Sequence, residues 1–182
     1  TSISDVNRQK LQSLVCRSLE NNPVTAIIGP RQSGKSTLAK SILGSLEQSI
    51  HLDLERPRDL AKLTDPELFF SSHKAKTICL DEIQRKPEIF PLIRSLVDEW
   101  GGNGHFLILG SASIQLLRQS SESLAGRIAY NKLYPFVFDE VKEHGSLQDF
   151  LVRGGYPRSF LAESQEASSE WLHNLIQTYI ER

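Results

Sequence analysis

The feature that most constrains the fold is an eight-residue run, Gly29-Pro30-Arg31-Gln32-Ser33-Gly34-Lys35-Ser36, which fits the pattern G-x-x-x-x-G-K-[ST] at each fixed position. An apolar run at residues 24–28 precedes it and predicts a buried strand, and residues 36–46 follow it with helical spacing. Glycines let successive backbone N–H groups turn inward around an anion, and the helix N-terminus adds its positive dipole end. The run therefore predicts a phosphate-binding loop between a strand and a helix of an α/β fold.

The side chains of this loop have predicted roles. Lys35 is expected to place its ammonium on the β- and γ-phosphates, and the Ser36 hydroxyl to bind Mg²⁺. Thr37 is expected near the α-phosphate, although helix capping explains it nearly as well. The sequence has no guanine-selecting N/T-K-x-D element, which favours ATP over GTP. The predicted cofactors are ATP or ADP and Mg²⁺. The predicted nucleotide-binding residues are Gly29, Pro30, Arg31, Gln32, Ser33, Gly34, Lys35, Ser36 and Thr37. The alternative is a glycine-rich turn with a lysine in solvent.

Further short apolar runs continue the α/β pattern. Helices between successive strands imply right-handed crossovers and hence a parallel sheet. The additional predicted strands lie at residues 50–54, 77–80, 106–109 and, more weakly, 129–133. From Asp139 onward the pattern changes to short helical stretches. We therefore divide the chain into a core at residues 1–138 and a small helical lid or connector at residues 139–182.

Acidic side chains follow the apolar run that ends at Leu80. In a phosphate-binding α/β protein, an aspartate at the end of such a strand orders the water shell of Mg²⁺, and a glutamate directly after it polarises the attacking water. These are the roles predicted for Asp81 and Glu82. The alternative is that the two residues only begin a surface turn.

Two more polar residues are candidates for catalysis. Ser111 follows the run at 106–109, at the sheet edge where ligands of open α/β folds bind, and is predicted to hold the catalytic water or sense the γ-phosphate. Arg127 follows a glycine and is predicted to act as an arginine finger, in its own chain or in a neighbouring subunit. A strand-end turn for Ser111 and a surface salt bridge for Arg127 are the alternatives.

Composition limits the partners. Twenty-one lysines and arginines balance 22 aspartates and glutamates, so no bulk positive charge attracts nucleic acid or an anionic membrane. Nucleic acid stays an open alternative as a partner, because basic residues between Arg56 and Lys86 could gather on one edge. No apolar run approaches the roughly twenty residues that span a bilayer. Cys16 and Cys79 have no metal-ligand spacing and read as reduced core thiols of a cytoplasmic protein.

The motifs together resemble the prokaryotic AAA-type ATPases that carry a C-terminal domain of unknown function. The resemblance covers residues 8 to 182 and implies a P-loop NTPase three-layer αβα sandwich. Its five-stranded parallel sheet would have the order 5-1-4-3-2, followed by a small C-terminal helical extension. It also implies the Mg²⁺ and water-activating pair Asp81 and Glu82, the sensor Ser111 and the finger Arg127. The motifs that carry it are residues 29–36, Leu52-Asp53-Leu54-Glu55, Asp81-Glu82-Ile83-Gln84, Gly110-Ser111-Ala112-Ser113, Leu124-Ala125-Gly126-Arg127 and Arg153-Gly154-Gly155-Tyr156-Pro157.

Three functions compete at this point. The first is an ATPase that hydrolyses ATP with Mg²⁺ to drive or reset an attached domain, and the Asp81-Glu82 pair supports it. The second is a nucleotide-gated switch that turns over very slowly, and the third is a small-molecule or nucleoside kinase. Because the chain starts without methionine and ends inside a helix, we expect a piece of a longer protein that lacks its C-terminal domain. A homo-oligomer is expected if Arg127 acts in trans.

Overall fold

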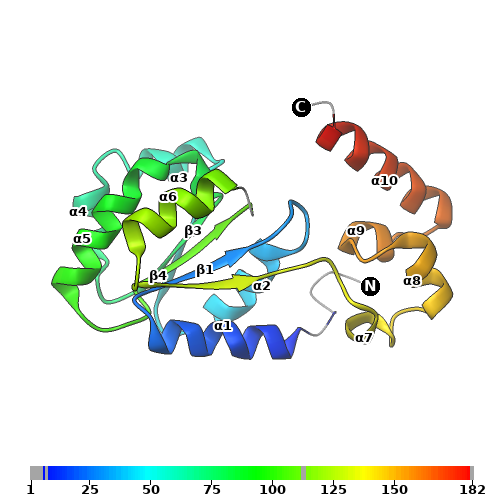
Figure 1. Cartoon of the computed structure of the whole chain (residues 1–182), viewed down its shortest axis with the longest axis horizontal. Helices are drawn as coiled ribbons and strands as arrows, with labels where there is room; N and C mark the ends of the chain where they lie inside the picture. The colour runs from blue at the N-terminus through cyan, green and yellow to red at the C-terminus, as the bar shows by residue number, and fades with distance from the viewer. Residues whose placement is uncertain (1–5, 7, 112–113, 181–182) are drawn as a thin grey trace.

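The computed structural model describes residues 6, 8–111 and 114–180, and its centre is a parallel sheet of five strands (Figure 1). The strand order is β2-β3-β4-β1-β5, which is the predicted order 5-1-4-3-2 read from the other edge. Each strand after β1 follows a helical crossover, as the alternation of apolar runs and helical spacing predicts. The strands are β1 (Val24–Ile28), β2 (Ser49–Asp53), β3 (Thr77–Asp81), β4 (Phe106–Gly110) and β5 (Ile128–Lys132).

Helices cover both faces of the sheet, because alternate side chains of each central strand point to opposite faces. On one face, Ala26 and Ile108 join a core with α4 (Pro66–Ser72) and α5 (Phe90–Trp100), while α3 (Pro57–Ala61) follows β2. On the other face, Ile27 and Leu107 pack against α1 (Gln9–Asn21) and α2 (Lys35–Gly44). Two 3₁₀ turns, η2 (Ile83–Arg85) and η3 (Pro87–Ile89), lead from β3 to α5, and α6 (Ile114–Leu124) leads from β4 to β5. This is the predicted three-layer sandwich.

Register places the functional segments at one edge of the sheet. Ile28 pairs with Gly110 on β4 and with Lys132 on β5, so the loop after β1 leaves the sheet beside the ends of β4 and β5. Asp53 at the end of β2 pairs with Asp81 at the end of β3. The carboxyl ends of all five strands therefore meet on the side where the phosphate loop begins.

Beyond β5 the chain forms four short or medium helices beside this edge (Figure 1). Their apolar side chains form a small core of their own with Val6 and Phe136, separate from the two cores of the sheet. The helices are α7 (Phe138–Val141), α8 (Leu147–Arg153), α9 (Pro157–Phe160) and α10 (Gln165–Ile180), which we call the helical unit. Within the described residues no helix is long and apolar enough to cross a membrane.

Candidate functional site

The glycine-rich loop after β1 is held by close backbone contacts. The Gly29 amide donates to the Gly110 carbonyl at 3.3 Å, and a Cβ at Gly29 would lie 2.0 Å from the Leu133 carbonyl oxygen. Only glycine, which has no Cβ, allows the backbone at residue 29 to lie this close to Leu133. Gln32 and Gly34 adopt left-handed backbone with φ of 61° and 96°. These two residues turn the chain into α2, whose N-terminus then points at the space enclosed by the loop.

Lys35 lies inside this loop rather than in solvent. Its Nζ donates to the carbonyl oxygens of Gly29 at 3.1 Å and Pro30 at 2.8 Å, and the residue is only 5% exposed. Burial lowers the pKa of Lys35 below its ordinary value, although the charges of Glu82 and Asp81 partly oppose the shift. The ammonium is thus held in place by two neutral acceptors that an anionic phosphate can replace.

Asp81 and Ser36 form the candidate magnesium-binding pair. Burial alone raises the pKa of Asp81, but the nearby His51 side chain and the Ser36 hydroxyl stabilise the carboxylate and outweigh burial, so that the net pKa is below the ordinary value. The His51 Nε2 lies 3.5 Å from one carboxylate oxygen, and the Glu82 amide donates to the other at 3.0 Å. A hydroxyl and a carboxylate that touch each other fit Mg²⁺, which takes one or two protein ligands beside phosphates and waters.

Glu82 occupies an unusual backbone position directly after the strand. Its φ of 57° and ψ of 47° lie in the left-handed region, which is uncommon for a residue other than glycine. This turn directs its side chain into a cavity of about 240 Å³ at the loop, and the Gln84 amide donates a hydrogen bond to its carboxylate. The residues that line the cavity are Gln32, Gly34, Lys35, Ser36, Thr37, Glu82 and Arg158. The structure thus brings Lys35, Ser36, Asp81 and Glu82 together.

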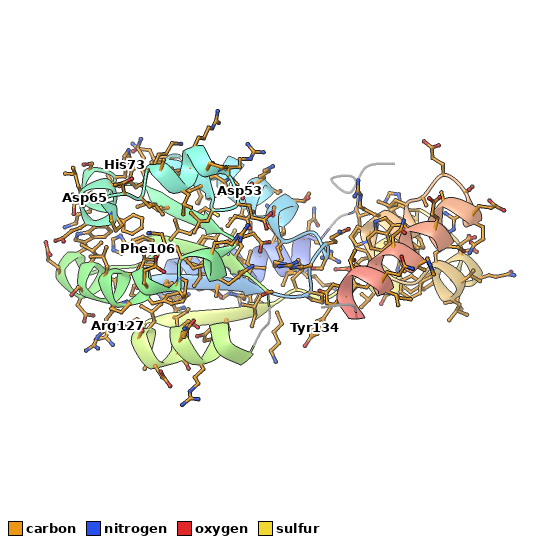
Figure 2. All side chains as sticks on the ribbon, turned by 90° about the horizontal axis from the view of Figure 1, so that it is seen from above. Asp53, Asp65, His73, Phe106, Arg127 and Tyr134 are labelled. Atoms are coloured by element: carbon orange, nitrogen blue, oxygen red, sulfur yellow. The ribbon has the colours of Figure 1, made fainter. Side chains whose placement is uncertain are left out.

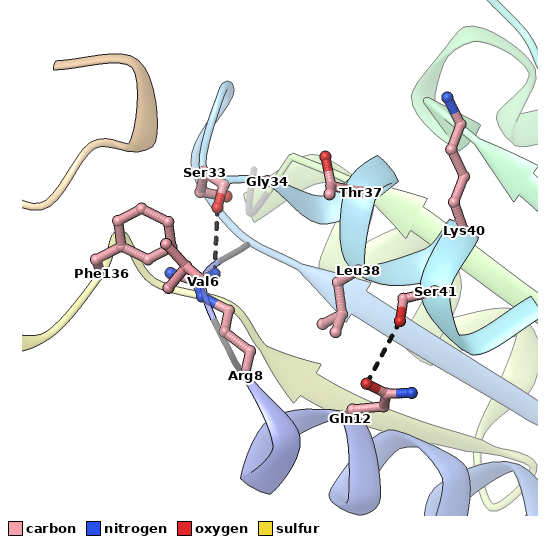
Figure 3. A pocket seen from close by; sticks show the side chains of 10 residues that line it. All are labelled: Val6, Arg8, Gln12, Ser33, Gly34, Thr37, Leu38, Lys40, Ser41 and Phe136. Carbon is pink, nitrogen blue, oxygen red and sulfur yellow. Dashed lines mark hydrogen bonds between the residues drawn. The ribbon is translucent and has the colours of Figure 1, made fainter. Parts of the chain in front are cut away.

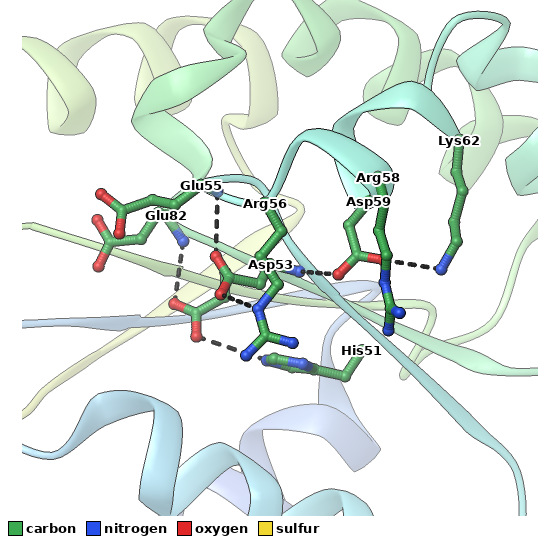
Figure 4. A network of polar contacts seen from close by, with 9 residues as sticks. His51, Asp53, Glu55, Arg56, Arg58, Asp59, Lys62 and Glu82 are labelled. Carbon is green, nitrogen blue, oxygen red and sulfur yellow. Dashed lines mark hydrogen bonds and ion pairs between the residues drawn. The ribbon is translucent and has the colours of Figure 1, made fainter.

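The acids that end β2 serve a different purpose (Figure 4). The Asp53 carboxylate accepts from the Glu55 amide at 3.0 Å and pairs with Arg56 at 3.2 Å. The Asp59 carboxylate accepts from the Asp53 amide and from Lys62, at 3.3 and 2.8 Å. These contacts fix the turn from β2 into α3, so the two aspartates have a structural role here.

Arg158 is the residue of this cavity that sequence reasoning missed. It belongs to α9 of the helical unit, and Pro157 starts that helix. The segment before it is fixed by the Phe136 amide, which donates to the Gly155 carbonyl at 2.6 Å. The glycines and proline of residues 153–157 predict a tight turn but do not show that the next side chain lines the phosphate cavity.

Ser111 and Arg127 lie outside the cavity. Ser111 is half-buried at the end of β4, beside the loop in the sheet register, while its neighbours Ala112 and Ser113 are outside the described residues. Arg127 precedes β5 and lies at the opposite edge of the sheet, far from Tyr134, which follows the same strand (Figure 2). Its guanidinium binds both oxygens of Asp98, at 2.5 and 2.9 Å. This corrects the prediction for a role in its own chain, and a role in trans stays a prediction.

A second cavity, of about 410 Å³, lies beside the phosphate cavity and shares Gly34 and Thr37 with it (Figure 3). Arg8 crosses it with its guanidinium 4.5 Å from the centre of the Phe136 ring, and donates to the Ser33 carbonyl at 3.2 Å. The other side chains around it are largely apolar or uncharged. Its lining includes Val6, Gln12, Leu38, Lys40 and Ser41. This cavity therefore lies directly next to the phosphate loop and α2.

Comparisons with known proteins agree with this geometry. A family model described as the AAA domain matches residues 21–142. The uncharacterized proteins Rv2008c of Mycobacterium tuberculosis and Mb2031c of Mycobacterium bovis are each 39% identical over 177 residues, which cover 97% of this chain. The chain spans 40% of the length of these curated relatives.

Solved structures share the fold at low sequence identity. The Walker-type ATPase PABY2304 of Pyrococcus abyssi aligns with a TM-score of 0.63 and 16% identity, over 100% of this chain and 75% of that one. The RuvB Holliday junction branch migration motor of Thermotoga maritima aligns with a TM-score of 0.53 and 15% identity, over 99% of this chain and 66% of that one.

Proposed function

Since this chain belongs to the AAA domain family of P-loop ATPases, we propose that it binds ATP with Mg²⁺ and hydrolyses it to ADP and phosphate. The observation that carries the proposal is the cavity in which Lys35, Glu82 and Arg158 meet above the loop. A cation that can bind phosphate, a carboxylate that can accept a proton, and a second cation from another part of the chain face one space. Water is the acceptor that this arrangement favours, because a carboxylate beside the cavity can take its proton.

Each residue then has a chemical role. The loop amides and Lys35 bind the phosphates, with Lys35 exchanging its two carbonyl partners for phosphate oxygens. Ser36 and Asp81 hold Mg²⁺, which when bound supplies positive charge to the phosphate oxygens. Glu82 accepts a proton from the attacking water, a contribution of about 10²–10⁴ in rate for a positioned base. Arg158 binds the charge that builds up on the transferred phosphate.

The base and sugar of the nucleotide fit the second cavity. This cavity meets the phosphate cavity at Gly34 and Thr37, so a nucleotide whose phosphates occupy the loop extends into it. Gln12 at its rim has an amide that can pair with a base edge, and it contacts the Ser41 hydroxyl at 3.5 Å (Figure 3). We assign ATP rather than GTP because no guanine-selecting element is present in the sequence.

The helical unit is the proposed route from hydrolysis to an attached domain. The Arg31 amide in the loop donates to the Tyr179 hydroxyl of α10 at 3.0 Å. A change in the loop on loss of the γ-phosphate therefore reaches the end of α10 through one hydrogen bond. Because the curated relatives extend well beyond the matched region, what hydrolysis drives in the whole protein is part of this proposal. A homo-oligomer with Arg127 acting in trans belongs to it as well.

A slow nucleotide-gated switch is the second candidate, and one observation favours it. Lys35 and Glu82 both have partners inside the protein that compete with phosphate and water. Tight binding with little turnover would follow if these partners were not exchanged.

Mg²⁺-dependent phosphate release tests the proposal. We expect turnover by the wild type and its loss in Lys35→Ala and in Glu82→Gln, with ATP binding lost only in the first. Lys10→Ala is the matched control, because Lys10 is an exposed lysine of α1 that lines neither cavity. A chain that binds ATP tightly without releasing phosphate supports the switch, and Glu82→Gln with wild-type turnover refutes Glu82 as the base.

Arg158 gives a second test within the same assay. A charge-assisted hydrogen bond contributes about 1.5–3 kcal/mol, so Arg158→Ala should weaken ATP binding or slow turnover by about 10- to 100-fold. Arg94→Ala removes an exposed arginine of α5 and should change neither quantity. Unchanged ATP affinity and turnover in Arg158→Ala would show that α9 does not serve the site.

A further inference from the structure

Gln84 contacts the proposed base from outside the phosphate cavity. Its Nε2 donates a hydrogen bond to Oε2 of Glu82, and Gln84 is not among the residues that line the cavity. The two residues belong to one tight turn, because Glu82 caps the 3₁₀ turn η2, whose first residue, Ile83, is buried in the core. Any influence of Gln84 on a nucleotide therefore passes through Glu82.

Among the described residues, the remaining half of the Gln84 amide makes no hydrogen bond that would compete with this contact. Its Oε1 is buried and has no hydrogen-bond partner within the described part of the chain. An unpaired buried acceptor is unfavourable, and a rotation of the amide by 180° would place this oxygen against the Glu82 carboxylate. The orientation that satisfies the donor is thus the one in which the amide binds Glu82.

We propose that Gln84 is a positioning residue for ATP hydrolysis, which holds one carboxylate oxygen of Glu82 so that the other faces the phosphate cavity. This inference rests on the proposed function. During attack the water oxygen bonds to the γ-phosphorus, the bond to the leaving ADP oxygen breaks, and the water proton passes to the free oxygen of Glu82. A carboxylate without the Gln84 contact turns about its side-chain bonds and spends less time in the productive orientation. The left-handed backbone of Glu82 sets the direction in which its side chain leaves the main chain, and the hydrogen bond from Gln84 sets the position of its carboxylate.

Steady-state kinetics of the full 182-residue chain test this role. Gln84→Met keeps the side-chain length but removes the donor, and we expect it to lower kcat about 10- to 100-fold with KM for ATP within about twofold. Gln84→Glu, which has the same shape without a donor to the carboxylate, should also lower kcat and serves if the methionine variant is unstable. Gln48→Met changes an exposed glutamine elsewhere and should leave kcat unchanged.

A double-mutant comparison distinguishes positioning from a general structural effect. In a Glu82→Ala background, adding Gln84→Met should leave the residual rate unchanged, because its target is absent. The inference alone is overturned if Glu82→Ala lowers turnover while Gln84→Met keeps or exceeds the wild-type kcat. It is also overturned if Gln84→Met changes only KM, or if it lowers the rate by the same factor in the wild-type and Glu82→Ala backgrounds. A wild-type chain without Mg²⁺-dependent phosphate release overturns the proposed function and this inference together.

Discussion

Substitution of Gly155 by alanine should separate the helical unit from the phosphate cavity. A Cβ at this position would lie 2.2 Å from the Phe136 carbonyl oxygen and within 3.2 Å of the Phe136 backbone carbon and nitrogen, where real Cβ atoms keep at least 3.0 Å from such an oxygen. All three neighbours are backbone atoms, and Phe136 is 4% exposed with the Arg8 guanidinium over its ring. Phe136 is held by the Arg8 guanidinium and by its packing with Val141 and Phe160 in the core of the helical unit, so we expect the segment around Gly155, which leads into α9, to be the part that moves.

The cost of this overlap follows from two terms. Overpacking costs about 1–3 kcal/mol, and loss of the hydrogen bond from the Phe136 amide to the Gly155 carbonyl costs about 0.5–1.5 kcal/mol. Even about 2 kcal/mol changes the ratio of docked to displaced helical unit by a factor of about 30. Because Arg158 follows Gly155 closely, we expect the Kd for ATP to rise about tenfold or more.

Tryptophan fluorescence reports the displacement directly. The chain has two tryptophans, and Trp171 of α10 packs on Tyr156 with ring centres 5.7 Å apart. In a Trp100→Phe background, emission from Trp171 should shift to longer wavelength when Gly155→Ala exposes it. Gly44→Ala is the control, because a Cβ there meets nothing within 4 Å and alanine should stabilise α2 by about 0.5–1 kcal/mol. Wild-type ATP affinity together with unchanged Trp171 emission in Gly155→Ala would refute the reasoning.

Two further predictions concern charged residues outside the cavity. At low protein concentration, Arg127→Ala should have the same turnover per subunit as the wild type, because Arg127 binds Asp98 at the end of the sheet opposite the phosphate loop. A lower turnover of the variant than of the wild type at that concentration would contradict this placement. The hydrogen bond from Lys62 lowers the pKa of Asp59 below its ordinary value of about 3.9. The ionised Asp59 therefore stabilises the folded state fully above that pH, and this stabilisation is lost as the pH falls through the lower pKa of the folded state. In urea unfolding between pH 6 and pH 2.5, Asp59→Asn should therefore lose less free energy of unfolding on acidification than the wild type, and parallel losses would count against the shift.

The sheet could be predicted from the sequence because local signals and topology agree. The loop motif has a fixed context of strand and helix, and short apolar runs separated by helical spacing leave a parallel sheet as the solution. The strand order came from the resemblance, and the structure confirms it. Lys35, Ser36, Asp81 and Glu82 meet because the carboxyl ends of parallel strands share one edge.

The position of Arg127 follows from the same rule, which places the amino ends of parallel strands at the opposite edge of the sheet. Arg127 precedes the predicted strand at residues 129–133, and the residue before a parallel strand lies at the amino edge, opposite the phosphate loop. The signal was therefore available. Arg158 and Gln84 had no comparable signal, because their positions depend on how the helical unit docks and on how one amide rotates, which residue spacing does not encode.

One buried guanidinium explains why the helical unit and the phosphate loop should respond together. Arg8 donates to the Ser33 carbonyl in the loop and to the Tyr134 carbonyl after β5, and it pairs with Glu140 of α7 at 3.3 Å. Burial lowers the pKa of Arg8 while Glu140 opposes the shift, and arginine remains charged in proteins. A charge held by three segments cannot leave one of them without losing a partner in a poorly hydrated place. We therefore expect that a nucleotide which moves Ser33 either moves the helical unit with it or breaks this contact.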